Sequence, residues 1–166
     1  CPCPRPGPYL MGSWEQAMDL QSLSAALEVA KAAEPDRSPP VKITVGGELV
    51  EIVFERVDGK LWASQCAKYA PRPDVPIDRN YGYNFHQVVI SVSPESGRLV
   101  TDDGLLPLDD DQWRGIYAEG VLSGHDFQRV ADAIWQVNEW GPQQKVAALS
   151  KASARASKRN SDSPEK

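Results

Sequence analysis

Cysteine and histidine are scarce in this sequence, and neither is arranged for chemistry. The 166 residues include three cysteines and two histidines. Cys1, Cys3 and Cys66 are an odd set without a recurring spacing, which excludes a disulfide scaffold and favours a reduced, cytosolic setting. His86 and His125 do not fit the HxxxH or HExxH spacing of a metal site. We therefore expect neither a metal nor a cofactor.

Long apolar runs and an excess of positive charge are also missing. No run approaches the roughly 20 apolar residues of a membrane-spanning helix, and the first residues lack the order of a signal peptide. The net charge is -5, which argues against nucleic acid because phosphate contacts require clustered Lys and Arg. We expect no membrane and no nucleic acid as partners. With 41% hydrophobic and 25% charged residues, the composition is that of a globular domain.

The remaining reactive side chains do not form a catalytic pattern. The acidic runs Asp102–Asp103 and Asp109–Asp111 lack the ligand order of a calcium loop. Aspartates at the start of a helix are favoured by its dipole without any metal. We expect no catalytic residue, and an enzyme that uses His86, His125 or Asp126 is the least favoured alternative.

The composition changes along the chain in four steps. Residues 1–12 are rich in proline and are expected to be a disordered leader. Residues 13–40 are expected to form a helix up to residue 33 and then a linker with three prolines. Residues 41–141 are the expected globular core, and residues 142–166 a basic tail that is helical or disordered. This tail has six basic and two acidic residues, hence +4, whereas 12 basic and 21 acidic residues elsewhere leave -9.

The core is predicted to be α+β and mainly α, with an N-terminal β-hairpin followed by a small bundle of about four to five short helices. Val41–Val57 predicts the hairpin, because apolar and polar residues alternate and Gly46-Gly47 supplies the positive φ of a tight turn. Residues 71–76 are expected to be an extended linker and residues 94–104 a loop. The expected helices cover 60–69, 83–93, 109–119, 123–140 and a last stretch from 142.

Capping residues mark two of these helices. Asp109 is placed to cap one helix, with Gln112 at the reciprocal position of a capping box. Ser123 is placed to cap the helix with the strongest apolar periodicity. Gly141-Pro142 is expected to end that helix, because glycine and proline commonly follow a helix C-terminus.

Aromatic residues are the candidates for a functional surface. Trp62, Trp113 and Trp135 fall in predicted helices beside other apolar residues, where packing into the core is the commoner role. Trp14 and Trp140 lie near the ends of elements, where an exposed indole would anchor a partner protein. The candidate partner-contact residues are Trp62, Tyr83, Phe85, Trp113 and Trp140.

The series of segments has a recognisable order between Val41 and Trp140. After the hairpin come LWASQCAKY at 61–69, PRPD at 71–74, YNF at 83–85, PLDDDQW at 107–113, LSGHDF at 122–127 and WQVNE at 135–139. This order resembles the tail assembly chaperones of siphophages that infect actinobacteria. The resemblance rests on the serial order and not on one motif. The Pro-rich leader does not match the family, so Met11 and Met18 are expected as alternative starts.

The resemblance implies a non-catalytic protein made in the host cytoplasm. It implies binding to the tape measure protein, with the tail tube protein as a further candidate partner and with room for self-association. Genes of this kind often use a programmed frameshift near their end, and this chain would then be the shorter product. The alternative is another small phage or bacterial interaction factor, such as a head-tail completion protein.

Overall fold

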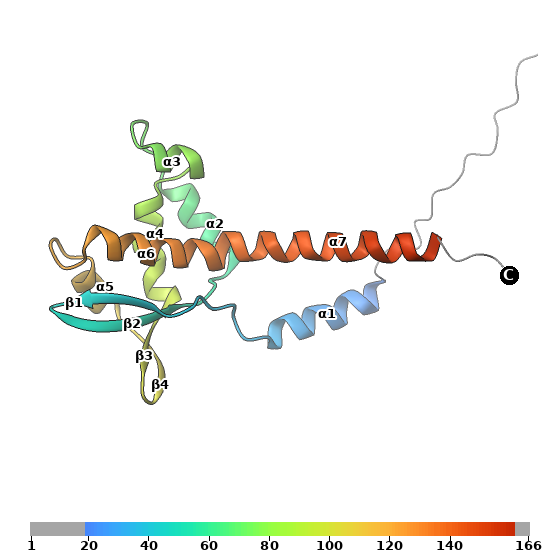
Figure 1. The fold of residues 1–166 in the computed structure, drawn as a ribbon, viewed down its shortest axis with the longest axis horizontal. Coiled ribbons are helices and arrows are strands. Elements are labelled where there is room, and N and C mark those ends of the chain that lie inside the picture. Colours follow the sequence, from blue (N-terminus) through green and yellow to red (C-terminus); the bar gives the residue numbers. More distant parts are fainter. Residues whose placement is uncertain (1–18, 162–166) are drawn as a thin grey trace, which may run out of the picture. The chain divides into compact units, whose positions relative to one another are not determined.

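The computed structural model describes residues 19–161 (Figure 1). The chain falls into two compact units that divide between Glu34 and Pro35. The first unit contains α1 (Leu20–Ala32), and the Asp19 carboxylate caps it by accepting the Ser22 N–H at 2.7 Å. This confirms the later part of the predicted N-terminal helix. The predicted leader and residues 13–18 lie outside the described residues.

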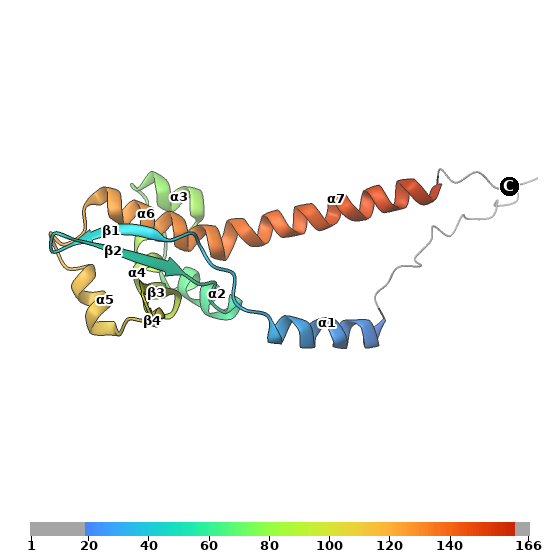
Figure 2. The same ribbon diagram turned by 60° about the horizontal axis from the view of Figure 1, so that its bottom comes forward.

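The second unit combines helices with one sheet (Figures 1 and 2). Its strands pair antiparallel in the order β1-β2-β3-β4. The elements in chain order are β1 (Val41–Val45), β2 (Glu48–Phe54), α2 (Gly59–Lys68), α3 (Pro76–Tyr81), α4 (Phe85–Ser96), β3 (Gly97–Thr101), β4 (Gly104–Pro107), α5 (Asp110–Ile116), α6 (Gly124–Trp135), η1 (Gln136–Trp140) and α7 (Gly141–Ser161). The α+β, mainly α class is confirmed.

The order of strands and helices differs from the prediction. The first hairpin is correct, and Gly46 and Gly47 have φ values of 60° and 88° as the tight turn requires. The prediction of one hairpin followed only by helices is wrong, because a second hairpin, β3–β4, follows α4. It pairs with the first, with Ile52 opposite Leu99. The second hairpin therefore completes a sheet that the first one began.

The predicted loop at 94–104 is wrong for two reasons. First, α4 continues through Pro94 to Ser96 although a proline inside a helix removes one hydrogen bond and crowds the carbonyl four residues earlier; Val92, Ser93 and Ser96 of this last part are buried in the core. Second, Gly97–Thr101 forms β3 against β2, a partner far away in the sequence. The predicted linker was also too long, because Pro76 opens the short helix α3, a position where proline is favoured.

The prediction that Gly141-Pro142 ends a helix is wrong as well. Figures 1 and 2 show α6, η1 and α7 as one continuous helix that leads away from the sheet. The N–H of Gly141 donates to the carbonyl of Gln136, five residues earlier. The chain thus passes through one π-helical turn and resumes as α7, where Pro142 needs no N–H of its own.

The hydrophobic core lies between the sheet and helices α2, α4, α5 and α6. Ile52 and Phe54 of β2 face this core, whereas Val53 lies outside the core cluster, as the alternation predicted. The fully buried aliphatic and aromatic side chains are Ile43, Ile52, Phe54, Phe85, Val88, Val89, Val92, Trp113, Val130 and Ile134. The predicted helix at 83–93 is confirmed by α4, whose Val88, Val89 and Val92 face this core.

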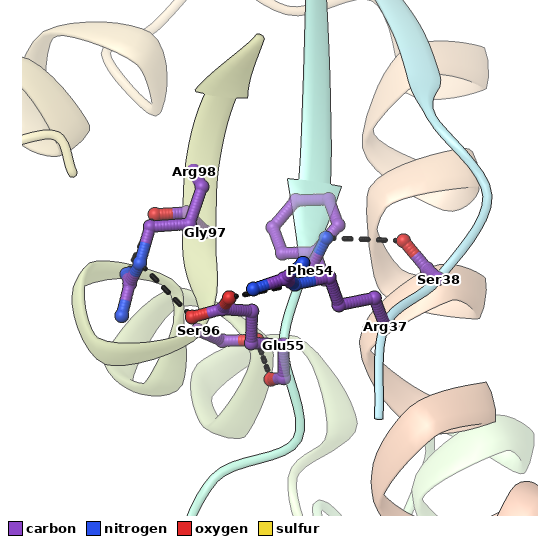
Figure 3. Close-up of polar contacts among 7 residues, drawn as sticks. All are labelled: Arg37, Ser38, Phe54, Glu55, Ser96, Gly97 and Arg98. Carbon is purple, nitrogen blue, oxygen red and sulfur yellow. Dashed lines mark hydrogen bonds and ion pairs between the residues drawn. The ribbon is translucent and has the colours of Figure 1, made fainter. Parts of the chain in front are cut away.

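Polar contacts around Glu55 tie two segments that are distant in the sequence to one end of β2 (Figure 3). The Glu55 carboxylate accepts from Nε of Arg37 at 2.9 Å and pairs with Nε of Arg98 at 3.1 Å. The Ser96 hydroxyl donates to the Glu55 carbonyl at 2.6 Å. Oγ of Ser38 accepts the last N–H of β2 at 3.0 Å. The segment before β1 and the α4–β3 junction are therefore both tied to β2.

Candidate protein-binding surface

The structure places the five candidate partner-contact residues in two different environments. The exposed fractions of Trp62, Tyr83, Phe85 and Trp113 are 9%, 6%, 1% and 2%, whereas that of Trp140 is 45%. The first four belong to the core because burial of apolar surface draws the apolar face of each helix inwards. Of the five, Trp140 alone offers a large aromatic area to another chain.

Trp140 is the outer end of a row of aromatic rings. Its indole stacks on Trp135 with ring centroids 5.8 Å apart and planes at 26°. Trp135 in turn meets Tyr81 of α3 edge to face at 5.7 Å. Tyr81 stacks on the buried ring of Phe85 at 4.6 Å. We call Trp140, Trp135 and Tyr81 the aromatic row, and it connects the core to the surface.

The π-helical turn is what brings Trp135 and Trp140 together. In an α-helix, residues five positions apart point about 140° away from one another. The bond from Gly141 N–H to the Gln136 carbonyl widens this turn, so both indoles emerge on one side. Such turns occur frequently at functional sites. Two tryptophans five residues apart just before a glycine are the only trace of this arrangement in the sequence.

Side chains of the turn itself hold it against the body of the second unit. Asn138 Oδ1 accepts the N–H of Val57 at 3.1 Å, and its Nδ2 donates to the carbonyl of Ile134 at 2.9 Å. Oε1 of Glu139 accepts from Nε1 of Trp62 at 3.0 Å. The buried candidate Trp62 thus supports the surface without being part of it. The turn that presents Trp140 is therefore fixed by polar bonds to α2 and to the segment after β2.

The groups beneath the row are held in their neutral forms. Burial, together with the nearby Glu139 carboxylate, raises the pKa of the Cys66 thiol to about 11. Burial, again with help from Glu139, raises the pKa of the Tyr83 hydroxyl. A neutral thiol is a poor nucleophile. Cys66 accordingly behaves as a packing residue, and it lies partly buried against the core.

The histidines and Asp126 are not brought together. The His86 ring meets Phe127 edge to face at 5.0 Å, and burial lowers the pKa of its imidazole. His125 is exposed in the first turn of α6. Asp126 borders a cavity of about 470 Å³ that is otherwise lined by residues of β1 and of two turns, and neither imidazole lines it.

A larger hollow, of about 590 Å³, lies between α4 and α5 and has Trp113 in its wall. The Trp113 ring stacks on Tyr117 with centroids 5.7 Å apart. Oγ of Ser93 and the Tyr117 hydroxyl share a hydrogen bond of 2.6 Å. Both rings are therefore held by the core, and the polar tip of Tyr117 is already occupied.

Within residues 19–161, no three His, Cys, Asp or Glu side chains gather closely enough to hold a metal ion. In the same range, we find no helix with the length and apolar character needed to cross a membrane. No protein-family model, curated protein or solved structure matches this sequence.

Proposed function

We propose that this protein is a non-catalytic factor that binds another polypeptide through the aromatic row. The observation that carries this proposal is the position of Trp140, which is exposed, stacks on Trp135 and lies on a turn fastened by Asn138 and Glu139. Rigid aromatic anchors dominate interface energetics because they bury a large area at a small cost in conformational entropy. A row of this kind is suited to hold an apolar segment of a partner.

The partner that we propose is the tape measure protein of a phage tail, with the tail tube protein as a second candidate. In this role the protein is a tail assembly chaperone that acts in the host cytoplasm. A chaperone covers apolar surface of its partner temporarily, which requires exposed aromatic side chains and no catalytic group. The serial order of segments between Val41 and Trp140 supports this choice over a head-tail completion protein.

Co-expression of the full chain with the tape measure protein, whose gene the proposal places next to its own, tests the proposal. We expect the tape measure protein to stay soluble and to co-purify with the tagged chain. Trp140→Ala should lower the affinity about tenfold or more, the effect of losing a central aromatic anchor. The matched control is Leu49→Ala, because Leu49 is also exposed and apolar but lies at the β1–β2 turn. This control should bind like the wild type.

Two results would contradict the proposal. One is a tape measure protein that stays insoluble beside the wild-type chain. The other is equal capture of the tape measure protein by the Trp140→Ala and Leu49→Ala variants, which would show that binding does not depend on the aromatic row. Circular dichroism of each variant verifies that the fold is intact before binding is compared.

A further inference from the structure

We infer that one side of α7 extends the aromatic row into a docking surface for an acidic helical segment of the partner protein. The inference rests on the proposed function, since the same partner would contact Trp140 and α7. Residues three or four positions apart along α7 lie on the same side of the helix as Trp140. They are Gln144, Ala147, Lys151 and Arg155, and the spacing continues at Lys158 in the sequence.

The charged residues of α7 are all basic. The sequence of α7 contains five Lys or Arg and no Asp or Glu. Lys151 and Arg155 are exposed, four residues apart on the side of Trp140. Lys145 lies on a different side, and its Nζ pairs with Asp36 at 2.5 Å, which holds the base of α7 to the body. We call Lys151 and Arg155 together with Trp140 the docking side.

These positions specify the chemistry of the occupant. Trp140 would contact an apolar side chain of the partner. Lys151 and Arg155 would pair with two carboxylates one helical turn apart. Trp140 and Lys151 are separated by 11 residues of helix, which is about 16 Å at 1.5 Å per residue. A partner helix that lies along α7 would need its apolar anchor and its carboxylates about 16 Å apart. Opposite charges at an interface favour this partner and speed its association.

Two other occupants fit the docking side less well. A second copy of α7 would bring Lys and Arg against Lys and Arg, which is repulsive. Nucleic acid would meet a protein whose residues 1–141 carry a net charge of -9, which repels its phosphates. The exposed Leu149 lies on the opposite side of α7, by helical spacing from Trp140, and is not part of this inference.

A synthetic peptide tests the charge preference with the full chain. The probe is a dye-labelled amphipathic 24-residue helix with leucines in its first turn and four glutamates on the same side three turns later. The matched control peptide has glutamine in place of each glutamate. Fluorescence anisotropy at low and at physiological salt should show the glutamate peptide binding roughly three- to tenfold tighter, as for two exposed ion pairs. The difference should shrink at the higher salt.

Variants of the chain locate the effect. The double variant Lys151→Glu/Arg155→Glu should abolish the preference for the glutamate peptide. The control Lys60→Glu/Lys68→Glu makes the same change of net charge at exposed positions of α2 and should retain the preference. Trp140→Ala should weaken both peptides equally, because it removes the apolar contact and leaves the charges.

Several outcomes would overturn the inference. The first two are equal binding of the two peptides and a preference for the glutamate peptide that the Lys151→Glu/Arg155→Glu variant retains. The third is tighter binding of a 20-base-pair DNA duplex than of the glutamate peptide. The fourth is a dimer of the wild type in sedimentation that the double variant dissociates. The tape measure capture separates the two proposals. Capture by the wild type and equally by the double variant removes the inference alone, whereas no capture by the wild type removes the proposed function.

Discussion

Gly97 lies so close to the indole of Trp113 that a Cβ built on Gly97 would stand 2.1 Å from Cζ2 and 2.7 Å from Cη2. Gly97 is the first residue of β3, and Trp113 belongs to α5. The missing side chain allows Trp113 to reach Phe54 of β2, with ring centroids 6.1 Å apart. One glycine therefore sets how closely α5 packs on the sheet.

Gly97→Ala is expected to lower the free energy of unfolding by about 1–3 kcal/mol, because the added methyl group overpacks a filled site. Urea denaturation with a constant m value measures this change. The control is Gly115→Ala in α5, where no atom lies within 4 Å of the added Cβ and alanine favours the helix by up to about 1 kcal/mol. Equal midpoints for the two variants would mean that the indole adjusts freely.

Trp113→Ala and Trp140→Ala should differ strongly in stability. Trp113 is 2% exposed, and removal of a large buried aromatic side chain typically lowers the free energy of unfolding by about 3–5 kcal/mol. Trp140 is 45% exposed, and its loss should lower that free energy by less than about 1 kcal/mol. Thermal melts of both variants measure the contrast. Similar losses of melting temperature would show that Trp140 also supports the fold.

Asn138→Ala should release the π-helical turn from the body. The N–H of Val57 would lose its acceptor Oδ1, and an unpaired backbone group costs about 1–2 kcal/mol of unfolding free energy. The stacked indoles Trp135 and Trp140 should also lose part of their near-ultraviolet circular dichroism. Gln143→Ala on the exposed surface of α7 serves as the control and should change neither quantity.

Asp78 makes the stability depend on pH in the acidic range. Hydrogen bonds from Arg72 lower the pKa of this carboxyl to about 2 from its ordinary value of 3.8, and the N–H of Phe85 adds to the effect. The folded-state pKa is thus below the unfolded one. The stabilisation is complete above about pH 4 and is lost as the pH falls from there towards 2.

Urea denaturation at pH 6, 4, 3 and 2.5 measures this loss. Asp78→Asn should be less stable by roughly 1–3 kcal/mol at pH 6, since it weakens the hydrogen bonds that the buried carboxylate accepts from Arg72 and Phe85. Its stability should also fall less steeply below pH 4 than that of the wild type. Identical slopes for both proteins would assign the acid loss to other carboxyl groups.

Local features were predictable where their bonds join neighbours in the chain. The capping box of α5 is one example, with the Gln112 N–H donating to Asp109 at 2.7 Å and the Asp109 N–H donating to Gln112 at 2.8 Å. The Ser123 hydroxyl likewise accepts the Asp126 N–H at 3.0 Å. Both depend on residues three positions apart, so spacing alone carries the information.

Features held by contacts between distant parts of the chain could not be predicted from the sequence. β3 is held by its pairing with β2, and its residues alone do not specify that partner. The turn at Gln136–Trp140 is held by Asn138 and Glu139, whose partners Val57 and Trp62 are far away in the chain. The pattern of apolar and polar residues within 94–104 or 136–140 does not indicate these distant partners.

The sequence by itself determined the α+β class, the first hairpin, the caps of α5 and α6 and the set of aromatic residues from which a binding surface would be built. Tertiary structure decided which of those aromatics are exposed. Trp62 and Trp113 lie on helix faces that other elements cover, whereas Trp140 is the last residue of a widened turn that directs it outwards. Caps and turns are bonds between close neighbours, but exposure depends on what packs over a side chain from elsewhere in the chain.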